Sequence, residues 1–103
     1  MKLLVGLGNP GKEYQNTRHN AGEKIIRLWA KENHFPLFKL NKKTQSLITK
    51  GFFNDEEIIL ALPQTFMNNS GLAIAKLIKM YNVSPNDIYI FHDELDIPLG
   101  DFQ

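Results

Sequence analysis

Short apolar runs separated by turn residues predict four β-strands in this chain. Leu3–Leu7 is a continuous apolar run that ends in glycine and proline, which is typical of a strand buried on both faces. Ser46–Phe53 and Glu57–Leu62 are joined at Asn54-Asp55-Glu56, a spacing that predicts an antiparallel hairpin. Ile88–Phe91 is predicted as the last strand.

Two stretches have the spacing of amphipathic helices. The first extends from Ala21 to His34 and is expected to end before Pro36, because the residue before a proline disfavours helix. The second begins at Asn69 or Ser70 and is ended by Asn82 with Pro85. The predicted buried stripes are Ala21, Ile25, Leu28 and Trp29 in the first helix, and Ile74, Leu77, Ile78 and Tyr81 in the second.

The order strand, helix, hairpin, helix, strand predicts one layered α/β domain over residues 1–103, with a mixed β-sheet flanked by helices. In open sheets of this class ligands bind where parallel strands exit. If the strands near Leu3, Ile58 and Ile88 are parallel neighbours, the loops that follow them meet at one edge. These loops span residues 8–20, 63–69 and 92–98, and they hold most of the candidate functional groups.

Composition narrows the class of protein. The 103 residues are 43% hydrophobic and 22% charged, which excludes disordered and fibrous classes. With zero cysteines the chain has no disulfide, thiolate zinc site or cysteine nucleophile. The apolar runs are far shorter than the roughly 20 residues of a spanning helix, and no signal region is visible. We therefore expect a cytoplasmic protein with no membrane partner.

Charge is distributed unevenly. Residues 1–50 hold ten Lys/Arg and three Asp/Glu, whereas residues 51–103 hold two and eight, so the halves carry about +7 and about −6. This asymmetry is compatible with a basic surface for a polyanion. A solvated basic face is the alternative interpretation.

The first loop contains the string Gly6-Leu7-Gly8-Asn9-Pro10-Gly11, a literal G-x-G-x-x-G. Dinucleotide binding needs a helix that starts at these glycines, but Lys12–His19 carries no apolar stripe. Pro10 also removes one backbone N–H donor. The physics therefore disfavours a dinucleotide site.

His19, Asp93 and several asparagines suggest hydrolytic chemistry. A carboxylate near an imidazole fixes its tautomer and stabilises its protonated form, so Asp93 is a candidate partner for His19. With no cysteine and no Ser–His arrangement implied, the economical role for His19 is general base on a water. The amides of Asn9, Asn68 and Asn69 can bind a carbonyl or an oxyanion. Plain loop and turn residues are the alternative at each position.

Two other features of the predicted loops, an acidic segment and a pair of apolar residues, each allow two interpretations. His92–Asp96 resembles a hard metal site, but successive strand residues point to opposite faces, so His92 and Asp93 share an ion only across a bulge. A solvated acidic turn is the alternative. Phe66 and Met67 either line an apolar wall of a cleft or anchor their loop.

The chain resembles the bacterial-type peptidyl-tRNA hydrolase family, through four motifs in the family's order. They are Gly6–Gly11 with Tyr14, Thr17–Gly22, Pro63–Gly71 and His92–Gly100. Members of that family are carboxylic ester hydrolases that cleave the bond between a peptide and the 3′ end of tRNA. The resemblance implies that His19 activates water, that Asp93 orients it, and that Asn9 and Asn68 contact the ester region. It makes Tyr14 and Met67 residues that shape the cleft.

The resemblance also implies that no metal or cofactor is needed, that peptidyl-tRNA is the partner and that the full-length family is monomeric. It covers only about the first half of the family pattern, so the expected fold is C-terminally incomplete. A glycine-rich segment with a further asparagine, later strands, C-terminal helices and tRNA-binding basic residues are missing. The alternative function is therefore a catalytically impaired fragment that only binds RNA, and a metal-dependent hydrolase is third.

Overall fold

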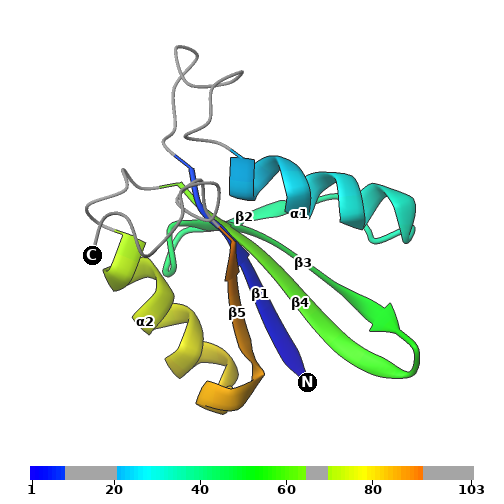
Figure 1. The fold of residues 1–103 in the computed structure, drawn as a ribbon. Coiled ribbons are helices and arrows are strands. Elements are labelled where there is room, and N and C mark those ends of the chain that lie inside the picture. Colours follow the sequence, from blue (N-terminus) through cyan, green and yellow to red (C-terminus); the bar gives the residue numbers. More distant parts are fainter. Residues whose placement is uncertain (9–20, 65–69, 92–103) are drawn as a thin grey trace, which may run out of the picture.

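A computed structural model describes residues 1–8, 21–64 and 70–91. They form a five-stranded sheet with one helix on each face (Figure 1). The elements in chain order are β1 (Lys2–Gly6), α1 (Ala21–Glu32), β2 (Lys39–Asn41), β3 (Ser46–Phe53), β4 (Glu56–Pro63), α2 (Ser70–Tyr81), the 3-10 helix η4 (Pro85–Asp87) and β5 (Ile88–Phe91).

The sheet has the strand order β2-β3-β4-β1-β5. β1 pairs in parallel with β4 on one side and with β5 on the other, so that Leu3 lies opposite both Ile59 and Ile88. β3 pairs antiparallel with both β2 and β4. The predicted mixed sheet is therefore confirmed, and so is the prediction that the strands near Leu3, Ile58 and Ile88 are parallel neighbours.

The predicted hairpin joins β3 and β4, but its turn is confined to Asn54 and Asp55; Glu56, predicted in the turn, begins β4. Both turn residues have positive φ angles, 50° and 67°. Two consecutive positive φ angles are typical of the two-residue turn whose twist matches that of antiparallel strands. β2 is an additional strand that the sequence pattern does not predict, because three residues are too few to show an alternation.

The core has two layers, because alternate residues of the central strands face opposite helices. Leu3 and Val5 of β1 pack in the layer that contains Leu77 of α2. Leu60 of β4 packs in the other layer, with Ile26 of α1. Both faces of β1 and β4 are thus covered, which is the physical reason for their nearly continuous apolar sequences.

The predicted buried stripe of α1 is wrong. Ile25 and Leu28 are 50% and 58% exposed, whereas Ile26 and Ala30 are buried and Trp29 is half-buried. The side chain of Ala21 lies outside the described part. The 3.6-residue spacing fits either register, and contact with the sheet selects the face that contains Ile26.

Both helices end in the left-handed backbone conformation. At α1 the residue is His34, with φ 61°, and the backbone N–H of Phe35 donates to the carbonyl of Ala30 at 2.9 Å. This is the Schellman arrangement, and it ends the helix at Glu32, two residues before the predicted end. At α2 the residue is Asn82, with φ 52°, as predicted.

The predicted stripe of α2 is confirmed. Leu77 is fully buried, and Ile74, Ile78 and Tyr81 are half-buried. Ala73 joins this stripe. Within residues 1–8, 21–64 and 70–91, neither helix is long and apolar enough to cross a membrane.

Candidate active site

The carboxyl ends of β1, β4 and β5 lie at one edge of the sheet, because the three strands are parallel neighbours (Figure 1). Gly6 at the end of β1 lies opposite Phe91 at the end of β5. The backbone N–H of Leu7 then donates to the carbonyl of Phe91 at 2.8 Å. The polypeptide therefore leaves these two strands from adjacent points.

The amino end of α1 packs against the same edge. A Cβ atom at Gly6 would lie 2.7 Å from the carbonyl oxygen of Gly22 and 2.8 Å from Cγ1 of Ile26. Only glycine permits this approach of helix to strand. Gly6, the first glycine of the G-x-G-x-x-G string, thus has a packing role in this structure.

The end of β4 is held by Gln64. Its backbone N–H donates to the carbonyl of Gln45 at 2.7 Å, and its side-chain Nε2 donates to the carbonyl of Leu62 at 3.0 Å. These bonds fix the point at which the chain leaves the third parallel strand. The described residues thus form the base on which a site at this edge would be built.

The predicted site residues themselves lie outside the described residues, and their geometry stays a prediction. They are Asn9, Tyr14, His19, Met67, Asn68 and Asp93. Phe66, Asn69 and the segment His92–Asp96 lie outside as well. In the described part of the chain no three His, Asp or Glu side chains are grouped to hold a metal ion.

The ion pairs that join β1 to β4 lie at the other end of β1. Glu56 accepts from the amino terminus at 2.6 Å and from Nζ of Lys2 at 3.1 Å. These donors lower the pKa of the Glu56 carboxyl, and Glu56 raises the pKa of Lys2. All three groups are at the surface, so the pairs tie the strands together without contributing to the candidate site.

A pocket that sequence reasoning missed lies between α1 and the residues that follow it. It is lined by Arg27 and Lys31 of α1 and by the segment from His34 to Phe38. The sequence signal was a run of aromatic and proline residues directly after a basic helix.

The strand order and the shared carboxyl edge define an open α/β domain, the class of fold that binds ligands outside its parallel strand ends. Three comparisons identify the family. The family model for peptidyl-tRNA hydrolase matches residues 3–103. The peptidyl-tRNA hydrolase of Dehalococcoides mccartyi is 50% identical over 100 residues, which are 97% of this chain and 52% of that protein.

The peptidyl-tRNA hydrolase of Francisella tularensis subsp. novicida is 44% identical over 103 residues, which are 100% of this chain and 53% of that protein. A crystal structure of peptidyl-tRNA hydrolase from Acinetobacter baumannii matches with a TM-score of 0.87 at 40% identity. It covers 97% of this chain and 50% of that one. The chain belongs to the peptidyl-tRNA hydrolase family, and it spans about half the length of the curated relatives it matches.

Proposed function

We propose that this protein hydrolyses the ester bond between the peptide and the tRNA of peptidyl-tRNA, and so releases tRNA for reuse in translation. The observation that carries the proposal is the convergence at one edge. Gly6 pairs with Phe91 in the sheet and packs against Gly22 of α1. His19 lies two residues before Ala21, where α1 begins, and Asp93 lies two residues after Phe91, where β5 ends.

Covalent geometry supports this pairing. Two residues of chain span at most about 7 Å, so His19 and Asp93 are attached within that reach of Ala21 and Phe91. This short attachment supports the proposal that the imidazole and the carboxylate meet at this edge. Asn9 follows Gly8 directly, and Asn68 lies four residues after Gln64.

The proposed reaction is an attack of water on the ester carbonyl. His19 removes a proton from the water while the new C–O bond forms, and Asp93 stabilises the resulting imidazolium. The amides of Asn9 and Asn68 hydrogen-bond the ester region and the negative charge that develops on the carbonyl oxygen. The tetrahedral intermediate then expels the 3′ oxygen of the terminal ribose, which takes the proton back from His19. The products are a peptide with a free carboxylate and a tRNA with a free hydroxyl.

This proposal extends to the surroundings of the site. Tyr14 and Met67 shape the cleft for the substrate, and the site works without metal or cofactor. The partner is peptidyl-tRNA, recognised through its acceptor end and its peptide, and the protein acts in the cytoplasm. The support is the family membership together with the basic first half of the chain, which suits a polyanion.

The test is His19→Ala in a peptidyl-tRNA hydrolysis assay that follows the release of free tRNA. Loss of the general base should lower turnover by roughly two to four orders of magnitude. The control is Glu32→Ala, an exposed change at the far end of α1, which should leave turnover unchanged. A rate that His19→Ala does not change would remove the general-base assignment.

The same assay tests the second candidate, RNA binding without catalysis. That candidate rests on the span of the chain, about half of its curated relatives. It predicts that the chain binds tRNA in a salt-sensitive way and does not hydrolyse peptidyl-tRNA. Hydrolysis by the unmodified chain with substrate bound at the site would exclude it. Chelator sensitivity would instead favour the metal-dependent alternative.

A further inference from the structure

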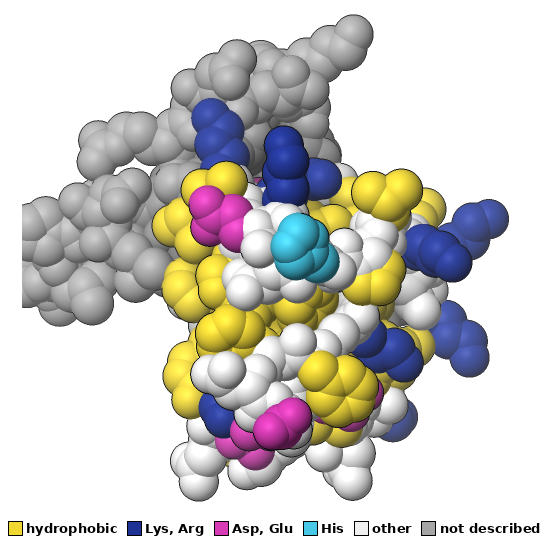
Figure 2. Space-filling view, turned by 90° about the vertical axis from the view of Figure 1, so that its right-hand side faces the viewer, with side chains coloured by type: hydrophobic (Ala, Val, Ile, Leu, Met, Phe, Trp, Pro, Cys, Tyr) yellow, Lys and Arg dark blue, Asp and Glu magenta, His cyan; other side chains and the backbone are white. Residues whose placement is uncertain are grey.

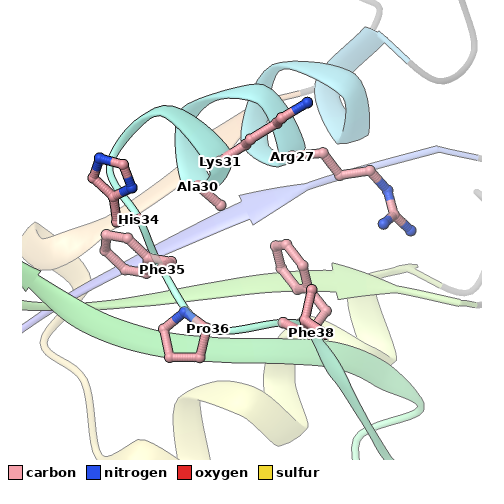
Figure 3. A pocket seen from close by; sticks show the side chains of 8 residues that line it. Arg27, Ala30, Lys31, His34, Phe35, Pro36 and Phe38 are labelled. Carbon is pink, nitrogen blue, oxygen red and sulfur yellow. The ribbon is translucent and has the colours of Figure 1, made fainter.

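We infer that the pocket between α1 and the segment after it binds a nucleotide, through both its phosphate and its base. The pocket has a volume of about 560 Å³, within the usual range for small-ligand sites. Figure 3 shows Arg27 and Lys31 coming from α1, while Phe35, Pro36 and Phe38 come from the segment that follows the helix. We name it the α1 pocket, after these five residues and His34.

The α1 pocket is separate from the candidate active site. α1 begins at the carboxyl edge of the sheet, where Gly22 contacts Gly6, and the pocket is built from its second half. Arg27 and Lys31 follow Gly22 by five and nine residues, a rise of about 8 and about 14 Å along the helix, so the pocket lies away from that edge. The inference therefore goes beyond the proposed function.

Its lining residues include basic side chains and no acidic one, while Arg27 also forms an ion pair with Glu23, one turn earlier on α1. Arg27, Lys31 and His34 contribute basic groups, and no Asp or Glu is among the residues that line it. Arg27 and Lys31 are four residues apart, so they project from the same face of α1. Nε of Arg27 donates to Oε2 of Glu23 at 2.9 Å, which uses one of the five N–H groups of the guanidinium. The terminal amino groups of arginine have the fork geometry that suits a phosphate.

The same pocket presents aromatic rings. The guanidinium carbon of Arg27 lies 5.6 Å from the ring centroid of Phe38. Phe35 packs against Trp29 with 5.3 Å between ring centroids, and this contact holds the ring in place. Phe35 and Phe38 are both half-buried, so part of each ring stays accessible. Arginine beside aromatic rings is the combination on which nucleic-acid bases stack.

Charge and rings together select the ligand class. An inorganic phosphate or an acidic peptide would match the basic groups but would leave the rings unused. A nucleotide uses both, either free or as one unit of single-stranded RNA. Leu37 at the rim is 88% exposed, and Figure 2 shows Lys and Arg side chains interspersed with hydrophobic ones on this side of the molecule.

The first experiment is a calorimetric titration of the protein with adenosine 5′-monophosphate, inorganic phosphate and adenosine. The nucleotide should bind more tightly than either of its parts. The double variant Arg27→Gln/Lys31→Gln should weaken nucleotide binding by at least about tenfold, because it removes charge-assisted bonds to the phosphate. Lys24→Gln/Lys76→Gln removes the same charge from exposed helical positions outside the pocket and should leave binding unchanged.

A second variant tests the stacking. Phe38→Leu keeps an apolar side chain but removes the aromatic face, so it should weaken nucleotide binding and leave phosphate binding unchanged. Trp29 is the one tryptophan of the chain, and its fluorescence should change on titration because it contacts Phe35. Circular dichroism of each variant confirms that the fold is retained.

The outcomes are distinct. Binding of a short oligoadenylate more tightly than the mononucleotide assigns the pocket to RNA, and equal binding assigns it to free nucleotides. Both results support the inference. Phosphate or hexaglutamate binding as tight as nucleotide binding would overturn it, as would an equal loss in the control variant. The titration measures nucleotide binding and does not depend on hydrolysis, which the His19→Ala assay tests separately. If the α1 pocket does not bind nucleotide, the proposed hydrolysis is therefore not contradicted.

Discussion

Single residues decide how close the elements of this fold approach. Gly6 is the clearest case, because a side chain there would overlap the backbone of α1 at Gly22. The sequence motif that contains Gly6 is easily interpreted as a phosphate-binding turn. The structure instead shows this glycine as the contact between β1 and the start of α1.

We predict that Gly6→Ala destabilises the protein by about 1–3 kcal/mol, the usual cost of forcing atoms into a packed interior. Denaturant unfolding of the two proteins measures the difference. The matched control is Gly71→Ala, because a Cβ there meets nothing within 4 Å. In helix α2 that control should be neutral or slightly stabilising, since alanine favours helix over glycine.

If Gly6→Ala proves as stable as the control, the close packing of strand and helix is not a stability determinant. The same variant also bears on the site. Displacing the start of α1 moves the attachment point of His19, so hydrolysis should fall even where the variant remains folded.

At the scale of elements, α1 shows why periodicity alone misassigns a buried face. Ile25 and Leu28 have the spacing of a core stripe, and so do Ile26, Trp29 and Ala30. Contact with the sheet decides between them. Gly6 lets the side of α1 with Ile26 pack closely on β1, and Ile25 and Leu28 remain at the surface.

We predict opposite results for two adjacent isoleucines of α1. Ile26→Ala should cost about 2–5 kcal/mol in unfolding free energy, because it leaves a cavity in the layer with Leu60. Ile25→Ala should change stability by less than about 0.5 kcal/mol. Chemical denaturation of both variants measures this contrast, and equal losses would contradict the assignment of Ile26 to the buried face and Ile25 to the surface.

At the scale of the whole molecule, the basic first half is the property that bears most on a nucleic-acid partner. Eight of its cationic side chains lie in the described strands, helix and turns, and most of them are exposed. They are Lys2, Lys24, Arg27, Lys31, Lys39, Lys42, Lys43 and Lys50, and Lys76 and Lys79 of α2 add to the surface charge. A polyanion that contacts them releases its counterions.

We predict that tRNA binding weakens steeply as salt is raised. The logarithm of the association constant should fall linearly with the logarithm of salt concentration, by about 0.7–0.9 for each phosphate neutralised. Filter binding or fluorescence anisotropy over a salt series gives the slope. A slope near zero would mean that phosphate contacts contribute little, and it would contradict a polyanion as the partner.

Much of the architecture follows from the sequence alone, because it depends on interactions between residues that are close together along the chain. Three features are of this local kind. They are the hairpin turn at Asn54 and Asp55, the end of α2 at Asn82 and the four predicted strands. The edge at which a site would lie also follows, once the parallel strands are recognised. The chemistry assigned to His19 and Asp93 comes from residue type and family resemblance, and it stays a prediction.

Three features were decided only by tertiary structure. They are the face of α1 that is buried, the pairing of β2 as a fifth strand, and the α1 pocket with Arg27 beside Phe38. Each depends on contacts between separate segments of the chain. The local sequence patterns of these segments fit other arrangements equally well. A sequence specifies which groups are available and at what spacing, but the free energy of burying one face against another selects which of them meet.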